Sequence, residues 1–270
     1  MGWRGYIHIP KKVVFFWSQK AACTSLFHFL EDSLDDPKTE NHYFHLNSQS
    51  YKQCMHAIKK KRFRSVILAR HPMSRSVSAY LNKFCQYKGQ VLRTRADLEP
   101  FAQKLHDLFC EDHGCDNDHN RMTYVQFLDT IALMRSRQHI SEFPINGHWE
   151  TQVPQFLLEK GLKYDDILHV ENLDAELGSL ANALGMNYRS RQLNKTDISL
   201  RARPEALIDV PACQVPEHDF SHSNFITPAT LRRVNNIYAV DFKAFGYDPL
   251  PRVLQENEVT GVKSVDVSPL

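Results

Sequence analysis

The stretch VVFFWSQKAACTSLFHFL, residues 13–30, places a short apolar run directly before an amphipathic segment. The run VVFFW at 13–17 is typical of a buried strand, and residues 23–34 carry apolar side chains at helical spacing. A buried strand that enters a helix through a short turn is the basic unit of an α/β fold. The turn contains no glycine, so it matches neither of the glycine-rich phosphate loops, GxxxxGK[ST] and GxGxxG.

The alternation of strand and helix patterns continues along the chain. Further strands are predicted at 65–69 and 165–171, and further helices at 50–61, 73–88, 98–109, 124–134, 151–160, 173–184 and 228–245. This order predicts one α/β domain over residues 1–250, with a central parallel sheet flanked by helices and a P-loop-like nucleotide cleft. Residues 186–227 are expected to be mostly irregular, and residues 251–270 are expected to form a flexible tail.

Composition narrows the class of protein. The 270-residue chain has a net charge of +2, which gives no global attraction to nucleic acid. It has no apolar run near the ~20 residues of a membrane span, and its N-terminal residues lack the apolar core of a signal peptide. The six cysteines are scattered along the chain, which predicts reduced thiols. These features predict a cytoplasmic protein without a nucleic-acid or membrane partner.

The turn after the first strand is a candidate anion site. A helix N-terminus offers unpaired backbone N–H groups and a partial positive charge, and small residues let an anion approach them. The hydroxyl groups and the lysine of this turn add further donors. The members of the candidate site are Lys20, Ala21, Ala22, Cys23, Thr24 and Ser25. The alternative interpretation is an ordinary turn between a strand and a helix.

A second stretch, ILARHPMSRSVSAYLNKF at 67–84, strengthens the first. Arg70 follows an apolar strand, at the edge where open α/β sheets bind their ligands. Pro72 suits the first turn of the next helix, and Ser78 follows one to two turns later. Arg70 and Ser78 are therefore predicted to converge on one anion, which the guanidinium group contacts through two hydrogen bonds.

Together the two stretches resemble the sulfotransferases that use 3′-phosphoadenosine 5′-phosphosulfate (PAPS). QKAACTS at 19–25 is similar to the loop that holds the 5′-phosphosulfate in the carbohydrate, or Golgi-type, branch, and LARHPMSRSVSAYLNKF at 68–84 is similar to the 3′-phosphate motif. HWETQ at 148–152, YDDILHVENLDAEL at 164–177 and IYAVDFKAFGYD at 237–248 also resemble that branch. Three departures are Gln19 for the usual proline, His71 for the usual aspartate, and an apparent insertion at 200–222.

The resemblance implies transfer of a sulfuryl group from PAPS to an acceptor hydroxyl of a saccharide or small natural product. It implies that Lys20 stabilises the leaving phosphate and that no metal is required. It also implies a histidine base between the two motifs: His45 is the preferred residue, and His42 is expected to assist it. The sequence does not name the acceptor or decide between oxygen and nitrogen as the acceptor atom.

Other residues are candidates for binding. His148 and Trp149 are predicted to line the acceptor site, with a packed core pair as the alternative, and His148 is also an outside candidate for the base. Lys195, with Arg201 or Arg203, is predicted to close over the donor, or else to lie in a solvated basic loop. Cys23 stands at a helix N-terminus, where the pKa of a thiol is expected to fall.

Several patterns receive a simpler interpretation. Cys110, His113, Cys115 and His119 are zinc-ligand types, but their spacing is tighter than in zinc fingers, so a solvent loop is preferred. The basic run at 59–64 is interpreted as a solvated helix end. Two other function classes stay open: a kinase-like phosphotransferase, which lacks its glycine-rich loop here, and a non-catalytic nucleotide-binding module, against which the presence of both Lys20 and His45 argues.

Overall fold

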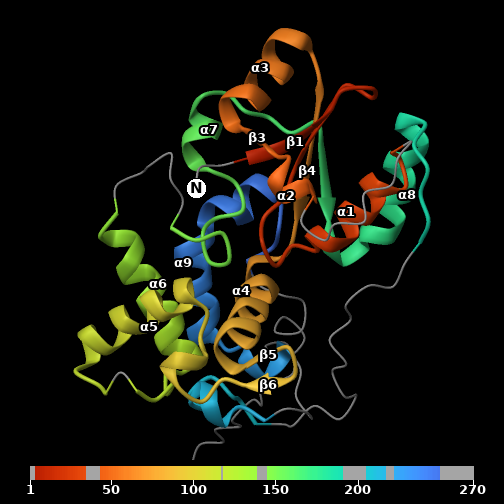
Figure 1. Ribbon diagram of the computed structural model, residues 1–270. Helices are drawn as coiled ribbons and strands as arrows, with labels where there is room; N and C mark the ends of the chain where they lie inside the picture. The colour runs from red at the N-terminus through yellow and green to blue at the C-terminus, as the bar shows by residue number, and fades with distance from the viewer. Residues whose placement is uncertain are drawn as a thin grey trace, which may run out of the picture.

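The computed structural model describes residues 4–34, 43–116, 118–138, 145–190, 205–216 and 222–249 (Figure 1). The strands are β1 (Arg4–His8), β2 (Val13–Phe16), β3 (Gln49–Ser50), β4 (Arg64–Ala69), β5 (Gln86–Tyr87), β6 (Gln90–Val91) and β7 (Asp166–His169). The α-helices are α1 (Cys23–Glu31), α2 (Tyr43–Leu46), α3 (Tyr51–Lys61), α4 (Pro72–Tyr80), α5 (Pro100–His113), α6 (Tyr124–Ser136), α7 (Gln155–Glu159), α8 (Leu173–Leu184) and α9 (Pro228–Phe245). Short 3₁₀ turns lie at η2 (Arg95–Asp97), η3 (Val170–Asn172), η4 (Ala212–Gln214) and η5 (His222–Phe225), and a π-helix, η1 (Leu81–Cys85), extends α4.

The main sheet has five strands in the order β3-β1-β2-β4-β7. Its centre is parallel, because β4 pairs in parallel with both β2 and β7. β1 runs antiparallel to β2 and to β3, so the sheet as a whole is mixed. The prediction of a parallel sheet is therefore correct for β2, β4 and β7 and wrong for the pairings of β1 with β2 and β3. β1 was not predicted because its five residues, RGYIH, are partly exposed and contain no continuous apolar run.

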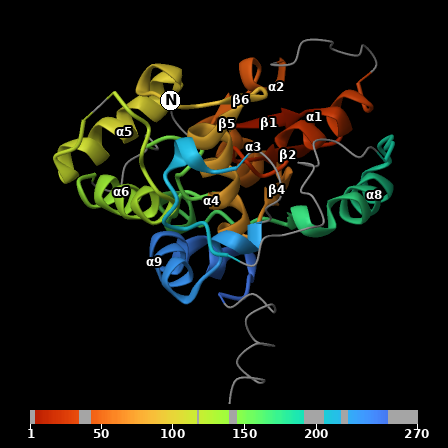
Figure 2. The ribbon, with the colours of Figure 1, turned by 90° about the horizontal axis from the view of Figure 1, so that it is seen from below.

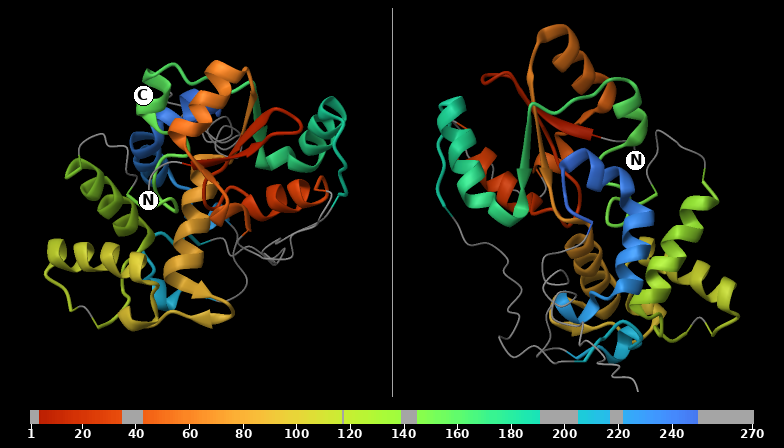
Figure 3. Two further views of the ribbon diagram at one scale, coloured as in Figure 1. Left: turned by 45° about the horizontal axis from the view of Figure 1, so that its top comes forward. Right: turned by 180° about the vertical axis from the view of Figure 1, so that it is seen from behind.

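The period-2 alternation of the central strands divides their side chains between two apolar layers. Val13 and Phe15 of β2 pack with α1 and α8, while Val14 and Phe16 pack with α3 and the end of α9. β4 is divided in the same way between its even and odd positions. Figure 3 shows the helices on the two sides of the sheet. Because both faces are covered, the central strands carry nearly unbroken apolar runs.

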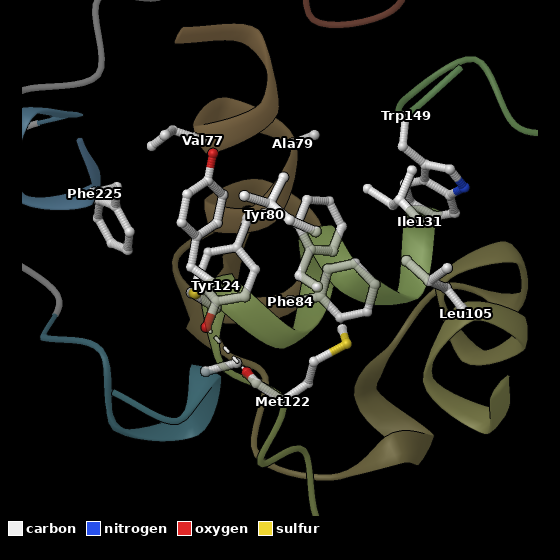
Figure 4. Close-up of a cluster of buried hydrophobic side chains, with 14 of the residues drawn as sticks. Val77, Ala79, Tyr80, Phe84, Leu105, Met122, Tyr124, Ile131, Trp149 and Phe225 are labelled. Carbon is white, nitrogen blue, oxygen red and sulfur yellow. Dashed lines mark hydrogen bonds between the residues drawn. The ribbon is translucent and has the colours of Figure 1, made fainter. Parts of the chain in front are cut away.

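A third apolar cluster lies beyond the sheet, among α4, α5, α6 and α9 (Figures 1 and 2). Figure 4 shows its aromatic centre, in which Tyr80, Phe84 and Tyr124 face one another. Tyr80 packs 5.3 Å from Tyr124 between ring centroids, and its hydroxyl group donates to the carbonyl oxygen of Met122 at 3.0 Å. This cluster fixes α4, the helix that follows Arg70.

The helix expected over 151–160 is limited to Gln155–Glu159. Most of the other predicted elements are confirmed, with a further difference at the helix expected over 73–88. That helix is α-helical only from Pro72 to Tyr80 and continues as the π-helix η1. The described parts of 186–227 contain only short 3₁₀ turns, as expected. The tail predicted at 251–270 lies outside the described residues. In the part of the chain that the structure describes, no helix has the length and apolar content needed to cross a membrane.

Candidate active site

The loop after β2 enters α1 through an unusual backbone. Lys20 and Ala22 both have positive φ, 66° and 53°, although neither is glycine. Such conformations cost free energy and cluster at functional sites. Ala22 is the N-cap of α1 and cannot cap it, and the first turn contains no acidic residue. The loop therefore presents the positive end of a nine-residue helix without a side chain of its own to neutralise it.

Arg70 follows β4, whose end lies beside the end of β2 because the two strands are parallel neighbours. Its Nη1 donates to the carbonyl oxygen of Lys20 at 3.0 Å. The side chain of Gln152 pairs with both backbone groups of Arg70: Oε1 accepts from the backbone N–H at 2.9 Å, and Nε2 donates to the carbonyl oxygen at 2.8 Å. The two anion motifs predicted from the sequence are thus in contact, and the backbone of Arg70 is fixed on both sides.

Arg75 ties the Lys20 loop to the segment around residue 148. Its side chain is 1% exposed, and it donates to the carbonyl oxygens of Gln19 at 3.0 Å, Gly147 at 2.6 Å and Glu150 at 2.8 Å. Burial lowers the pKa of Arg75, but the three carbonyl groups and the nearby carboxylate of Asp241 compensate the buried charge. Arg75 is therefore a structural residue of the site rather than a surface donor.

Asp241, on α9, extends this network of hydrogen bonds to the segment around Gln152. Its carboxylate is fully buried and accepts the backbone N–H of Gln152 at 2.9 Å and that of Val153 at 3.3 Å. Burial raises its pKa to about 6 against the opposing effect of Arg75. A chain of contacts therefore runs from α9 through Gln152 to Arg70. The sequence does not predict this chain of contacts, because Asp241 stands there only within the resemblance at 237–248.

The electrostatics of the site favour an anion. Burial, together with the charges of Lys83 and Arg70, lowers the pKa of Lys20 to about 8, and Cys23 and Glu99 oppose this shift weakly. Burial also lowers the pKa of His222 to about 4, with contributions from Arg70 and Lys20. Because cations that lie this close repel one another, a bound polyanion would relieve the repulsion and raise these pKa values. His222 was not identified from the sequence.

Lys83 enters the site from the π-helix. It is 7% exposed, pairs with the Glu99 carboxylate at 2.5 Å, and lies 4.5 Å from the ring centroid of Tyr87. π-Helices are rare and are frequent at functional sites. The sequence pattern predicted a continuous α-helix here, so it gave no sign that Lys83 would face Lys20.

The other predicted residues are distributed as follows. His45 of α2 is half-buried, and its ring lies against Phe27 and Trp17, with centroids 4.8 Å and 5.9 Å apart. It thus contacts the residue from which the Lys20 loop begins. Ser78 is half-buried on α4. His42 and Lys195 lie outside the described residues, as do Arg201 and Arg203.

His148 and Trp149 lie in different environments. Trp149 is 1% exposed and packs with Phe84 and Phe127, so it is a core residue (Figure 4). His148 is half-buried and stacks on Phe101, with centroids 4.8 Å apart and an interplanar angle of 5°.

Two expectations about cysteines are resolved. Burial raises the pKa of Cys23, contrary to the prediction, because desolvation of the thiolate outweighs the stabilisation from backbone N–H groups and Lys20. The solvent loop expected around Cys110–His119 is wrong for its first four residues, because Cys110–His113 belong to α5 and Cys110 is buried, while Cys115 is an exposed free thiol. Within the described residues no group of three or more metal-ligand side chains converges. His113 contacts its own helix at the carbonyl oxygen of Phe109, 3.1 Å away.

Both single-residue departures from the motifs fit the structure. His71 is the N-cap of α4, and its Nδ1 accepts the backbone N–H of Met73 at 3.3 Å, which is the role that an aspartate plays at this position. Gln19 lies against Gly147, where an added Cβ would stand 1.8 Å from its Oε1. The absence of a side chain at Gly147 therefore leaves room for glutamine in place of proline.

Comparison with known proteins agrees with this geometry. The sequence profile of the sulfotransferase family matches residues 6–248, which include both anion motifs and the Asp241 helix. No curated protein and no solved structure matches the chain. The match covers most of the 270 residues, so the chain belongs to the sulfotransferase family and is an enzyme that uses PAPS as its sulfuryl donor.

Proposed function

We propose that this enzyme transfers the sulfuryl group of PAPS to a hydroxyl group of a saccharide or small natural product. The observation that carries the proposal is the contact between the two anion motifs, in which the Arg70 guanidinium binds the carbonyl oxygen of Lys20 at 3.0 Å. A ligand with anionic groups at both of its ends fits two neighbouring cations on separate strands. The carbohydrate branch rests on the sequence resemblance alone.

The donor fits the residues that are present. The Lys20 loop and the α1 N-terminus supply small side chains and positive charge for the 5′-phosphosulfate, and Arg70 with Ser78 supplies donors for the 3′-phosphate. The first turn of α1 has no carboxylate that would repel an anion. The bound donor supplies an activated sulfuryl group and a phosphate leaving group.

The residues of the chain then act on charge and protons. Lys20 in its protonated form stabilises the negative charge that develops on the leaving oxygen, together with backbone N–H groups of the loop. His45 accepts the proton of the acceptor hydroxyl group as the hydroxyl oxygen attacks sulfur, and His45 thereby becomes an imidazolium cation. The contact of His45 with Trp17, three residues before Lys20, supports this assignment.

The kinase-like alternative has less support. The turn lacks the glycines that wrap a triphosphate. The non-catalytic alternative, which predicts binding without turnover of PAPS, does not agree with membership of the sulfotransferase family.

The deciding experiment is a calorimetric titration of the full chain with adenosine 3′,5′-bisphosphate, the product of PAPS, in parallel with ADP. We expect binding of the bisphosphate that ADP does not match and that Arg70→Ala removes. Arg93→Ala is the matched control, because Arg93 is exposed, and it should leave binding unchanged. Equal binding of ADP, or full binding by Arg70→Ala, would overturn the assignment of the 3′-phosphate site.

A further inference from the structure

The side chain of His148 is held by its neighbours in one orientation. Its ring stacks on Phe101, and its Nδ1 lies 2.8 Å from Oδ1 of Asn146. The same Oδ1 also accepts the backbone N–H of His148 at 3.0 Å. A histidine in an ordinary polar loop would have no such fixed partners.

This double contact fixes the tautomer of the ring. Because this side-chain atom of Asn146 accepts a backbone N–H, it is the amide oxygen and not the amide nitrogen. The same oxygen must therefore also accept a hydrogen bond from the ring. Nδ1 of His148 therefore carries the proton, and Nε2 carries the lone pair. Nε2 makes no hydrogen bond within the described residues and is not among their buried unpartnered atoms, so on this half-buried residue it reaches the surface.

The surroundings keep the ring neutral. Burial, together with the charges of Lys83, Lys20 and Arg75, lowers the pKa of His148 to about 3. Glu99, the N-cap of α5, is paired with Lys83, and Glu150, two residues after His148, is paired with Arg135. The ring is thus neutral at pH 7, with Nε2 available as a hydrogen-bond acceptor, and it is a poor proton carrier. This argues against His148 as the base and separates its role from that of His45.

We propose that His148 binds the acceptor substrate, with Nε2 accepting a hydrogen bond from a hydroxyl group of the acceptor. His148 thereby selects acceptors that carry a hydroxyl group and no positive charge over amines. A hydroxyl group donates one proton to Nε2 without adding positive charge. An ammonium group at Nε2 would be subject to the same charges of Lys83, Lys20 and buried Arg75 that act on the His148 ring, and they would repel it. The inference rests on the proposed function, since it assigns the acceptor side of the same site, and it favours O-sulfation over N-sulfation.

The tautomer can be measured without knowledge of the acceptor. The full chain labelled with ¹⁵N-histidine should show for His148 a protonated Nδ1, an unprotonated Nε2 and no titration between pH 5 and pH 8. The resonance is assigned by its loss in His148→Phe. Asn146→Ala should release the tautomer preference. A protonated Nε2, or a charged ring at pH 7, would overturn the inference.

The role is measured by transfer of labelled sulfate from PAPS to a panel of methyl glycosides, phenols and glucosamine. His148→Phe keeps the stacking ring and removes the acceptor atom, so we expect KM for the hydroxyl acceptor to rise about tenfold or more, with kcat changed less than about threefold. His148→Gln, which restores an acceptor oxygen, should recover much of the loss. His113→Phe is the control, because His113 lies 12 residues, about 18 Å, along α5 from Phe101.

The outcomes separate the two proposals. Unchanged bisphosphate affinity in His148→Phe, together with the KM effect, supports the inference. An unchanged KM, a fall in kcat alone, or preferential sulfation of the glucosamine amine overturns it. If the wild-type protein binds no bisphosphate, the proposed function fails, and the tautomer measurement still decides whether Nε2 of His148 is the acceptor atom described here.

Discussion

The guanidinium group of Arg70 donates to the carbonyl oxygen of Lys20 across 3.0 Å, although 50 residues separate them in the chain. This contact joins the ends of two parallel strands and uses one donor of a side chain that has several. The residue proposed to hold the 3′-phosphate thereby also supports the backbone of the residue proposed to hold the sulfuryl end. Changes at Arg70 are therefore expected to affect both ends of the donor.

Arg70→Lys tests this double role. Lysine keeps the charge but cannot bind Lys20 and a phosphate through the two edges of a planar group. We expect the affinity for adenosine 3′,5′-bisphosphate to fall by about 10- to 100-fold, and kcat to fall as well because the Lys20 loop loses its support. Calorimetry and steady-state kinetics measure the two effects. A lower affinity with unchanged kcat would show that the contact with Lys20 has no catalytic consequence.

Lys20→Met is expected to remove activity and yet to stabilise the ligand-free protein. The folded-state pKa of about 8 lies below the ordinary value of 10.5, so the folded protein binds this proton less strongly than the unfolded chain does. The loss of folding stability caused by burying the Lys20 charge is full below about pH 8 and disappears as the pH rises toward 10.5. The melting temperature of Lys20→Met should therefore exceed that of the wild type at pH 7, and the difference should narrow at pH 9.5. An equal or lower melting temperature at pH 7 would contradict the electrostatic account of the site.

The local elements of this fold could be predicted from the sequence, and the reasons are physical. β2 is buried on both faces and wholly apolar, and β4 is buried and apolar from Val66 to Ala69. The helices α8 and α9 have the bounds expected from their spacing. The strand β1 could not be predicted, because a partly exposed edge strand needs no apolar run. Nothing in its sequence distinguishes it from a polar N-terminal segment.

The candidate site was predictable only where a motif was local. Arg70 and the Lys20 loop stand in short stretches with their own pattern, and both face the same edge of the sheet. Lys83 and His222 reach the site through a π-helix and a 3₁₀ turn, and neither has a sequence pattern that fixes its direction. Contacts between distant segments, such as Asp241 with Gln152, depend on tertiary packing and not on local spacing.

Asp241→Asn tests the chain of contacts that runs from Asp241 through Gln152 to Arg70. An asparagine offers one acceptor oxygen, and its NH₂ group would face backbone N–H groups, so we expect a loss of about 1–3 kcal/mol in the free energy of unfolding at pH 7. The bisphosphate affinity should fall as well, because Gln152 holds the backbone of Arg70. Urea denaturation and calorimetry provide the two measurements.

The pH dependence of this variant gives an independent check. The folded-state pKa of Asp241, about 6, lies above the ordinary value of 3.8, so the stability linked to its proton is full below about pH 4 and is lost as the pH rises through 6. The wild type should therefore gain stability over Asp241→Asn as the pH falls from 6 to 4. A constant difference between the two proteins would show that Asp241 does not titrate in this range.

Arg75→Met should be the most destabilising of these substitutions. It removes a buried donor from three carbonyl oxygens, on Gln19, Gly147 and Glu150, and leaves them without that partner in a closed environment. We expect a loss of about 3 kcal/mol or more in the free energy of unfolding. Arg233→Ala is the matched control: Arg233 pairs with Asp129 at the surface, 2.8 Å away, and the loss of such a pair costs less than about 1 kcal/mol. Urea midpoints compare the two variants, and similar midpoints would mean that Arg75 is not the residue that holds the Lys20 loop against the segment around His148.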